Sequence, residues 1–310
     1  MQSTTAPVST ALAGNLRDKP GEWWVHWVLR LSAASTFIGH GAFGLKGKEA
    51  WLQYYDVLGI PATAGWDLMP LTGSVDIALG IVVLLLPVRA ALLYMAAWGL
   101  FTAALRPLAG EGVFELVERS YNFGPAFALL LLHGVGTSVR DWFSPLDGVP
   151  RLTRDRARTF AAGFRAIIAA YLIGHGALAV VIGKPLLLDL YGSIGVADPA
   201  TLNDVAGLFE IGLGALLLLA RTATTPILLF VVAWKLGTES LYITNHSAGA
   251  GWEVIERGGS YASPLALICL NSIVKRKNSE HQPRHDPNAQ GFAGTSHDRT
   301  GTPSTVAQRR

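Results

Sequence analysis

Long runs of hydrophobic residues alternate with short polar segments along most of the chain. Nearly uninterrupted apolar stretches occur at residues 77–86, 126–132 and 213–220. A helix needs about 20 mainly apolar residues to cross the hydrocarbon core of a bilayer. The pattern therefore predicts an all-α membrane protein with eight transmembrane helices, of which the fourth and eighth are short. The predicted spans are residues 23–45, 66–86, 90–108, 123–139, 164–182, 202–220, 225–243 and 261–274.

Two segments between the spans, residues 47–61 and 111–120, are too short and too polar to cross a membrane. Their aromatic and apolar positions predict short elements that lie at the outer interface. Three further segments have no apolar periodicity and separate the chain into parts. We expect a disordered arm at 1–22, a basic linker at 140–160 and a disordered tail at 275–310.

The pentapeptide Ile-Gly-His-Gly-Ala occurs at residues 38–42 and again at 173–177. Other positions match in the same order, so the sequence predicts two copies of one four-helix unit, residues 23–139 and 161–274. Because four spans per unit is an even number, the two bundles should be parallel. The matched positions include Lys48 with Lys184, Asp76 with Glu210, Trp98 with Trp234, and Glu118-Arg119 with Glu256-Arg257.

Composition supports a membrane location. Charged residues make up 15% of the chain, against about 25% in soluble domains. The net charge of +3 is carried largely by the linker, the inner turns and the start of the tail. The positive-inside rule then puts both termini in the cytoplasm of an inner-membrane, multi-pass protein, and the same distribution does not form a nucleic-acid surface.

The chain has one cysteine, Cys269. An intrachain disulfide, a dithiol relay and a cysteine-rich metal cluster are therefore excluded. Any redox chemistry would require a cofactor or a partner protein.

Two carboxylates, Asp76 and Glu210, are predicted near the middle of the second and sixth spans. A charge at that depth costs roughly 2.5–3.5 kcal/mol on insertion scales, so each side chain should point into the protein. Each has a glycine three residues before it and another four residues after it, which favours close helix packing on the same face. Two interpretations remain open: a carboxylate that handles protons or anchors a ligand, and a structural carboxylate that is neutral or paired.

Lys235 and Glu239 add charge to the seventh span, where the first copy has Gly99 and Ala103. Together with Glu210 they predict a buried cluster in the second copy. The cluster either neutralises itself or marks the second copy as the one that keeps an active cavity. Trp98 and Trp234, at matched positions of the third and seventh spans, are further candidates for ligand contact.

His40 and His175 lie in the outer halves of the first and fifth spans. Each is predicted either to form a structural hydrogen bond or to contact a quinone or another substrate. Haem ligation is disfavoured because His26 and His133 are at the inner ends of their spans, and no metal site is predicted. At the outer mouth, Glu118-Arg119 and Glu256-Arg257 predict an ion-pair patch or a ligand contact.

Each half resembles the DoxX-like family of small four-span membrane proteins. The resemblance covers residues 24–274 and rests on an early arginine followed by a glycine-rich first span, a Gly-Lys pair, an acid in the second span, and a Glu-Arg pair before a tyrosine. The first copy departs from the pattern by having Asp76 where the second has Glu210. The residues that carry the resemblance are Arg30, Gly39-His40-Gly41, Gly47-Lys48, Gly59-Ile60, Asp76, Glu118-Arg119 and Tyr121, with Arg165, Gly174-His175-Gly176, Gly183-Lys184, Gly195-Val196, Glu210, Glu256-Arg257 and Tyr261.

This resemblance implies membrane-bound redox work linked to quinones or thiosulfate in some members, and assembly or trafficking roles in the wider group. The first hypothesis is accordingly a component of a quinone-linked membrane oxidoreductase, with quinone as the candidate cofactor and a soluble or membrane redox partner. The alternative is a non-enzymatic protein, either a carrier of a small solute or a membrane assembly scaffold. Whether the chain is an enzyme stays open at this stage.

Overall fold

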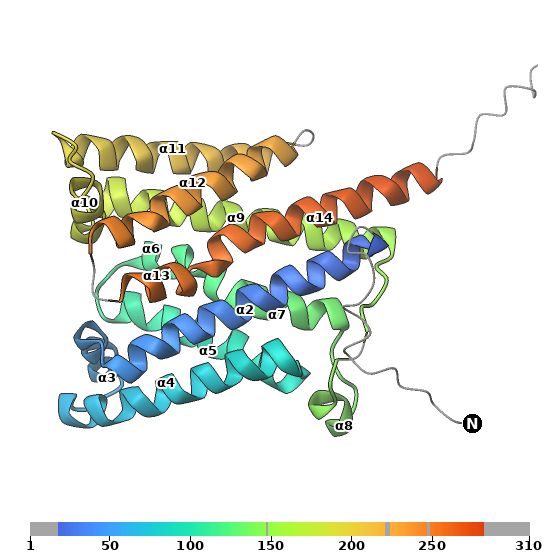
Figure 1. Ribbon diagram of the computed structural model, residues 1–310, viewed down its shortest axis with the longest axis horizontal. Coiled ribbons are helices and arrows are strands. Elements are labelled where there is room, and N and C mark those ends of the chain that lie inside the picture. The colour runs from blue at the N-terminus through green and yellow to red at the C-terminus, as the bar shows by residue number, and fades with distance from the viewer. Residues whose placement is uncertain (1–17, 147, 221–223, 247–248, 282–310) are drawn as a thin grey trace, which may run out of the picture.

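The computed structural model describes residues 18–146, 148–220, 224–246 and 249–281. Long helices that run roughly along one axis make up most of this part of the chain (Figure 1). The predicted helical fold is therefore confirmed for the described residues. The long helices are α2 (Gly21–Lys46), α4 (Ala62–Leu85), α5 (Arg89–Leu108), α7 (Ser120–His133), α9 (Arg154–Ala177), α11 (Pro199–Leu219), α12 (Thr224–Thr244) and α14 (Gly258–His281).

Shorter helices join them. The predicted segment 47–61 contains a 3-10 turn and α3, and the segment 111–120 contains α6. In the second half, a π-helical turn extends α9 before the chain turns into α10. The short elements are η2 (Glu49–Trp51), α3 (Leu52–Val57), α6 (Val113–Glu118), α8 (Val139–Phe143), η3 (Leu178–Ile182), α10 (Pro185–Gly192) and α13 (Ala250–Glu256).

The prediction of a disordered tail from residue 275 is wrong for residues 275–281, which form the last turns of α14. Asn278 accepts hydrogen bonds from Arg154 (2.8 Å) and Arg158 (3.1 Å) of α9, which hold these turns against the neighbouring helix. The rest of the predicted tail, 282–310, and residues 1–17 of the predicted arm lie outside the described residues. The predicted disordered arm is wrong for residues 21–22, which begin α2 and include the buried Glu22.

The predicted linker, residues 140–160, is partly helical. Ser138 and Asp141 form a capping box that starts α8. The hydroxyl of Thr153 accepts the backbone N–H of Arg156 and starts α9 ten residues before the predicted span. The fourth span ends early, at His133, because Gly134 adopts a positive φ of 78° that closes the helix.

Five helices are long and apolar enough to cross a membrane: α4, α5, the continuous helix Arg154–Ile182, α11 and α12. These five make the chain a membrane protein by length and composition. The remaining long helices, α2, α7 and α14, are shorter or more polar and lie towards the centre of the molecule (Figure 1). In α2 the polar groups Glu22, His26 and Arg30 are buried by neighbouring helices. Because such groups do not face lipid, the helix that carries them need not be strongly apolar.

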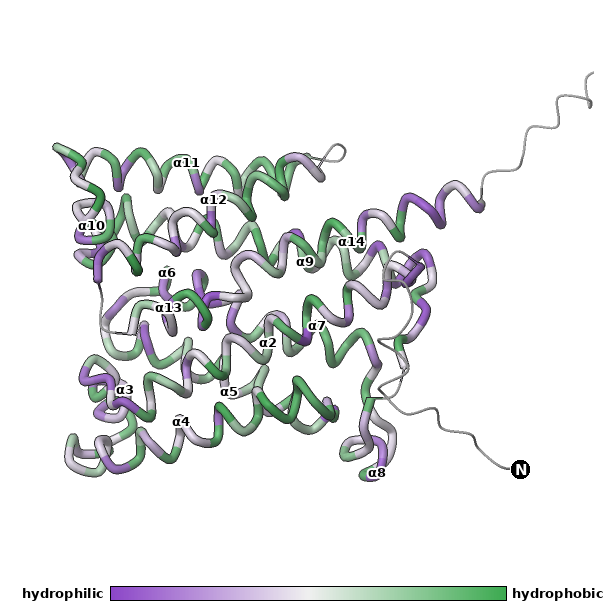
Figure 2. Tube along the Cα trace, viewed as in Figure 1, coloured by the Kyte–Doolittle hydropathy of each residue, from purple (hydrophilic) through white to green (hydrophobic). Residues whose placement is uncertain are grey.

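The two halves of the sequence share one packed interior. α14 lies against both α2 and α9, while α6 of the first half packs on α9 and α13 of the second half packs on α2. The main hydrophobic core accordingly mixes residues from both halves, such as Leu29, Phe164 and Leu267. Figure 2 shows the contrast between apolar outer helices, such as α4 and α11, and the hydrophilic residues around α6 and α13.

Candidate functional site

The two glycines of the first Ile-Gly-His-Gly-Ala segment face opposite sides of α2. Residues two apart on a helix are separated by about 200°. Gly39 faces α13, where an added Cβ would collide with the backbone of Glu256. Gly41 faces α4, where an added Cβ would lie 2.5 Å from the carbonyl oxygen of Gly73. Gly39 therefore allows α13, from the other half of the chain, to pack closely on α2. Gly41 allows the same close packing by α4, from the same half.

The second segment has the same arrangement. A Cβ on Gly174 would lie 2.5 Å from the backbone nitrogen of Glu118 on α6, and Gly176 meets the backbone of Gly207 on α11. In each half the histidine between these glycines is held by close backbone packing on two sides. Its ring is thus directed to the acid on the second long helix of its half.

His40 and Asp76 form the closed end of the first site. Nδ1 of His40 lies 2.8 Å from Oδ2 of Asp76. The Asp76 side chain is 1% exposed and that of His40 is 22% exposed, so the histidine stands between the buried acid and a more open space. On its other side the imidazole stacks on Trp51, with ring centroids 4.4 Å apart and planes inclined by 23°. The mid-span acid and the repeated histidine, which the sequence left as separate candidates, are one hydrogen-bonded pair.

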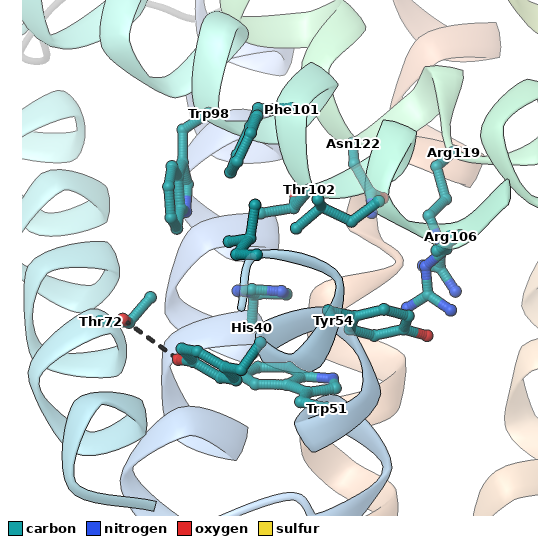
Figure 3. A pocket seen from close by; sticks show the side chains of 13 residues that line it. His40, Trp51, Tyr54, Thr72, Trp98, Phe101, Thr102, Arg106, Arg119 and Asn122 are labelled. Atoms are coloured by element: carbon teal, nitrogen blue, oxygen red, sulfur yellow. Dashed lines mark hydrogen bonds between the residues drawn. The ribbon is translucent and has the colours of Figure 1, made fainter. Parts of the chain in front are cut away.

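A cavity of about 620 Å³ opens beside His40 (Figure 3). Trp51 lies on one side of the imidazole in this view, and Trp98 and Phe101 lie on the other side. Tyr55 also lines the cavity. Arg106 and Arg119 form the far, charged edge. The remaining lining residues are Tyr54, Leu58, Thr72, Thr102, Leu105 and Asn122.

A second, smaller cavity of about 260 Å³ lies on the Asp76 side of the same histidine. It shares four residues with the larger cavity and reaches the acid itself. The two cavities thus adjoin at His40: the larger one has aromatic walls, and the smaller one reaches the buried carboxylate of Asp76. The lining of the smaller cavity is Thr36, Phe37, His40, Asp76, Trp98, Gly99, Thr102 and Asn122.

The second half pairs the same residue types more completely. Glu210 lies 2.5 Å from Nδ1 of His175 and accepts a 2.8 Å hydrogen bond from Nε1 of Trp234. Nζ of Lys235 lies 3.3 Å from Glu210 and 3.1 Å from Glu239. Every one of these charges is neutralised by a neighbour, so the cluster is a closed ion-pair network.

This network continues towards α13 and the segment that follows α2. Nε of Arg257 lies 3.0 Å from Glu239, and the same guanidinium pairs with Glu253. Glu253 in turn lies 3.0 Å from Nζ of Lys48, in the first half. Buried ion pairs of this kind hold their partners in place, because the loss of one charge leaves another unpaired.

The larger cavity lies in the first half, whereas the sequence left open that only the second half keeps an active cavity. The cavity beside His175 measures about 260 Å³, whereas the one beside His40 measures about 620 Å³. Lys235 pairs with Glu210 and Glu239 at the positions where the first half has the small residues Gly99 and Ala103. The alternative, mutual neutralisation, describes the second half.

The predicted Glu-Arg pairs, Glu118-Arg119 and Glu256-Arg257, take part in ion pairs within the protein. Arg119 lies 3.4 Å from Glu115 and 3.9 Å from Glu118, and Arg257 lies 4.0 Å from Glu256. Lys184 of the second half pairs with Glu115 of the first half, as Lys48 pairs with Glu253. These contacts join α6 and α13 to the opposite half. Arg119 also lines the large cavity of the first half, whereas Arg257 does not line the cavity beside His175.

Sequence reasoning missed the aromatic chamber. Trp51 and Tyr54 were placed only in an interfacial segment, yet they line the cavity. The hydroxyl of Tyr54 donates a 2.5 Å hydrogen bond to Glu111, which also lies 2.9 Å from Arg106. Burial raises the pKa of Tyr54, so its hydroxyl keeps its proton. The aromatic residues of segment 47–61 were the signal that could have indicated this wall.

Nδ1 of His26, near the N-terminus of α2, lies 2.9 Å from Nε2 of His133, at the C-terminus of α7. They contact each other and not His40, so the structure does not bring the histidines of the first half to one level. Within the described ranges, no group of three or more His, Cys, Asp or Glu side chains is arranged to hold a metal ion. No protein-family model, curated protein or solved structure matches the chain.

Proposed function

We propose that this protein is a component of a quinone-linked membrane oxidoreductase, and that the cavity of the first half holds the ring of the quinone-type ligand. The observation that carries the proposal is the His40–Asp76 pair at the closed end of a chamber of about 620 Å³ with aromatic walls. Such a chamber fits a flat apolar ring, because aromatic faces pack against it and exclude water.

The pair provides proton chemistry where the ring would lie. If Nδ1–H of His40 donates to Asp76, Nε2 remains as a hydrogen-bond acceptor. A histidine supported by a buried carboxylate can take a proton from a ring hydroxyl, because the carboxylate stabilises the imidazolium that forms. Since the chain has one cysteine, the electrons would pass to a redox group of a soluble or membrane partner.

The second half has a supporting role in this proposal. Its histidine and glutamate are engaged by Lys235 and Trp234, and its cavity is smaller. We therefore expect it to orient the first half through α13 and the Lys48–Glu253 contact. The DoxX-like resemblance and the matched contacts of the two halves support an origin from a duplicated four-span unit.

We further propose that all eight long helices cross the inner membrane, with both termini in the cytoplasm. The support is that the inner ends of α2 and α14 lie at the same end of the molecule as α8 and the basic linker (Figure 1). The smaller number of strongly apolar helices follows from the central position of α2, α7 and α14, which neighbours shield from lipid.

Binding of a short-chain benzoquinone and its quinol to the purified protein tests the function. We expect isothermal titration to show one site per chain. His40→Ala should weaken binding about tenfold, a loss typical of one or two hydrogen bonds to a buried group. The matched variant His175→Ala should leave the affinity within about twofold, because His175 borders the closed network.

If the wild-type protein binds neither ring form and no quinone can be extracted from freshly purified protein, the proposal fails. The non-enzymatic alternatives, a small-solute carrier or an assembly scaffold, would then be the better description. If both histidine variants weaken binding equally, the assignment of the site to the first half fails.

A further inference from the structure

Four buried polar atoms around the smaller cavity have no hydrogen-bond partner in the described part of the chain. They are Oγ1 of Thr36, Oδ1 of Asp76, Nε1 of Trp98 and Oδ1 of Asn122. Buried polar groups in folded proteins are nearly always paired, because an unpaired one retains its full desolvation cost. Four such atoms around one space indicate that something polar occupies it.

The second half shows how the same residues look when they are paired. There the indole of Trp234 donates to Oε1 of Glu210 over 2.8 Å. Asp76 is one methylene shorter than Glu210, and the matched indole of Trp98 is left without an acceptor. The Asp-for-Glu difference therefore opens one donor and one acceptor towards the same cavity of about 260 Å³.

A hydroxyl group satisfies both atoms at once. Its oxygen can accept from the Trp98 indole while its hydrogen is donated to Oδ1 of Asp76. A carbonyl oxygen can only accept, so it would leave the Asp76 oxygen unpaired and place two oxygens with lone pairs near each other. Nε2 of His40 adds a second acceptor, so a ligand group that donates is favoured further.

We propose that this cavity is a subsite for an aromatic hydroxyl, held between Oδ1 of Asp76 and Nε1 of Trp98, and that the site consequently prefers the hydroxyl form of its ring ligand to the carbonyl form. The inference rests on the proposed function, because it concerns the ligand of the same chamber. It adds that a quinol or another phenol, and not the oxidised quinone, is the form held most tightly. A reaction that delivers the reduced form must therefore precede binding.

The ring itself would extend from this subsite into the larger chamber. His40, Trp98, Thr102 and Asn122 line both spaces, so the two cavities adjoin and a ring attached to the bound hydroxyl would lie towards the larger one. The amide of Asn122 can present its oxygen or its nitrogen to a second polar substituent. No charged group of the ligand is required, because Arg106 is already paired with Glu111.

Three matched ligands test the inference on the purified wild-type protein: a short-chain 1,4-benzoquinol, its dimethyl ether and the corresponding benzoquinone. We expect the quinol to bind about tenfold or more tightly than either of the others, the size of effect that a hydrogen bond to a charged group gives. Equal affinity for all three would overturn the inference and leave the proposed function standing. Absence of binding by all three would overturn the proposed function itself.

Asp76→Glu is the decisive variant because it installs the residue of the matched position. We expect the longer side chain to reach Trp98, close the subsite as in the second half and remove the preference for the quinol. A variant that folds, as judged by gel filtration, and keeps the full preference would overturn the inference.

Trp98→Phe is the second variant, which keeps a flat ring and removes only the donor. It should reduce the affinity for quinol several-fold without changing the His40–Asp76 pair. Unchanged quinol affinity in this variant would also overturn the assignment. Trp234→Phe is the control at the matched position, and it should leave ring binding unaltered.

Discussion

Nζ of Lys48 lies 3.0 Å from Oε1 of Glu253, and this ion pair joins the two halves of the chain. Lys184 and Glu115 form the matched contact in the opposite direction. The two pairs hold α13 and α6 over the glycines that precede His40 and His175. Interaction between the halves therefore depends on these two ion pairs as well as on the shared apolar core.

Acid should weaken this connection. Burial opposes ionisation of Glu253, but the charges of Arg257 and Lys48 outweigh it and hold the pKa of this carboxyl well below its usual range. A group with a lowered folded-state pKa stabilises the fold above its unfolded-state pKa, about 4.3 for glutamate, and loses that contribution as the pH falls below it. We expect the melting temperature in detergent to fall as the pH drops from about 5 to about 3.

Lys48→Met tests the origin of this pH dependence. The variant should melt slightly lower than wild type at pH 7 and lose less stability on acidification, because one of the charges that lower the pKa of Glu253 is gone. Superimposable pH profiles for the two proteins would contradict this explanation. Burial opposes ionisation of Glu111, but Tyr54 and Arg106 outweigh it and lower the pKa of this carboxyl. Glu111 should therefore preserve part of the acid response in both the wild type and the variant.

Replacement of Gly174 by alanine should destabilise the protein. The new Cβ would lie 2.5 Å from the backbone nitrogen of Glu118, and backbone cannot move aside as a flexible side chain can. We expect a loss of roughly 1–3 kcal/mol in the free energy of unfolding, as for other overpacked interiors. Thermal or denaturant unfolding in a fixed detergent measures it.

Gly163 on the same helix provides the control. Nothing lies within 4 Å of a Cβ added there, so Gly163→Ala should be neutral or stabilise the helix by up to about 1 kcal/mol. If both alanine variants behaved alike, the close approach of α6 to α9 would not be the reason for the glycine.

Lys235→Met should be among the most destabilising single changes. Its side chain is fully buried between Glu210 and Glu239, and removing one partner of a buried ion pair costs about 3–5 kcal/mol. Addition of Glu239→Leu should recover part of that loss, because fewer buried charges then lack a partner. The ion-pair network would be contradicted if the double variant lost more free energy of unfolding than the two single variants lose together.

Arg276 and Glu280 form the control pair with the same sequence spacing. Their side chains are 52% and 59% exposed. Arg276 also lies 3.6 Å from the buried Glu22, so the control change is made at the other partner: Glu280→Gln should change the stability by about 0.5 kcal/mol or less. The comparison separates the effect of burial from that of a helical ion pair as such.

Trp51→Leu should weaken ring binding in the first half. The indole stacks on His40 and forms one wall of the chamber, and an aromatic pair contributes about 0.5–1.5 kcal/mol beyond its buried area, or roughly two- to tenfold in affinity. Trp142→Leu, on α8 at the other end of the molecule, should leave the affinity unchanged. Equal effects of the two changes on a titration with benzoquinol would remove Trp51 from the site.

Cysteine labelling can distinguish eight crossings from five. In a Cys269→Ser background, we expect Asp56→Cys to react with a membrane-impermeant maleimide from outside the cell, and Arg140→Cys and Ser279→Cys to react only after permeabilisation. Between Arg140 and Ser279 lie α9, α11, α12 and α14. If only the strongly apolar helices crossed, α14 would not, and these two positions would be labelled from opposite sides.

The helical elements follow largely from local pattern, and the residues that matter most in the first half were visible in the sequence. His40 and Asp76 were both predicted to be special, because a repeated histidine between glycines and an acid in an apolar segment are each unusual. Their pairing was not predicted, since it depends on how closely α2 approaches α4. The end of the eighth helix was misplaced because its last turns are held by hydrogen bonds from α9 and not by apolar residues.

The positions of the apolar helices and the recurring residues follow from the sequence, because lipid-facing surfaces and repeated residues are properties of short segments. The interlocking of the two halves and the larger cavity in the first half follow only from how the helices pack. The reason is one of charge and reach. Lys235 and Glu239 form ion pairs in the second half where the first half has Gly99 and Ala103, and the indole that Glu210 contacts in the second half has a matched indole, that of Trp98, which Asp76 does not reach. The effect of such sequence differences depends on contacts between residues that are distant in the chain, so it is known only from the folded structure.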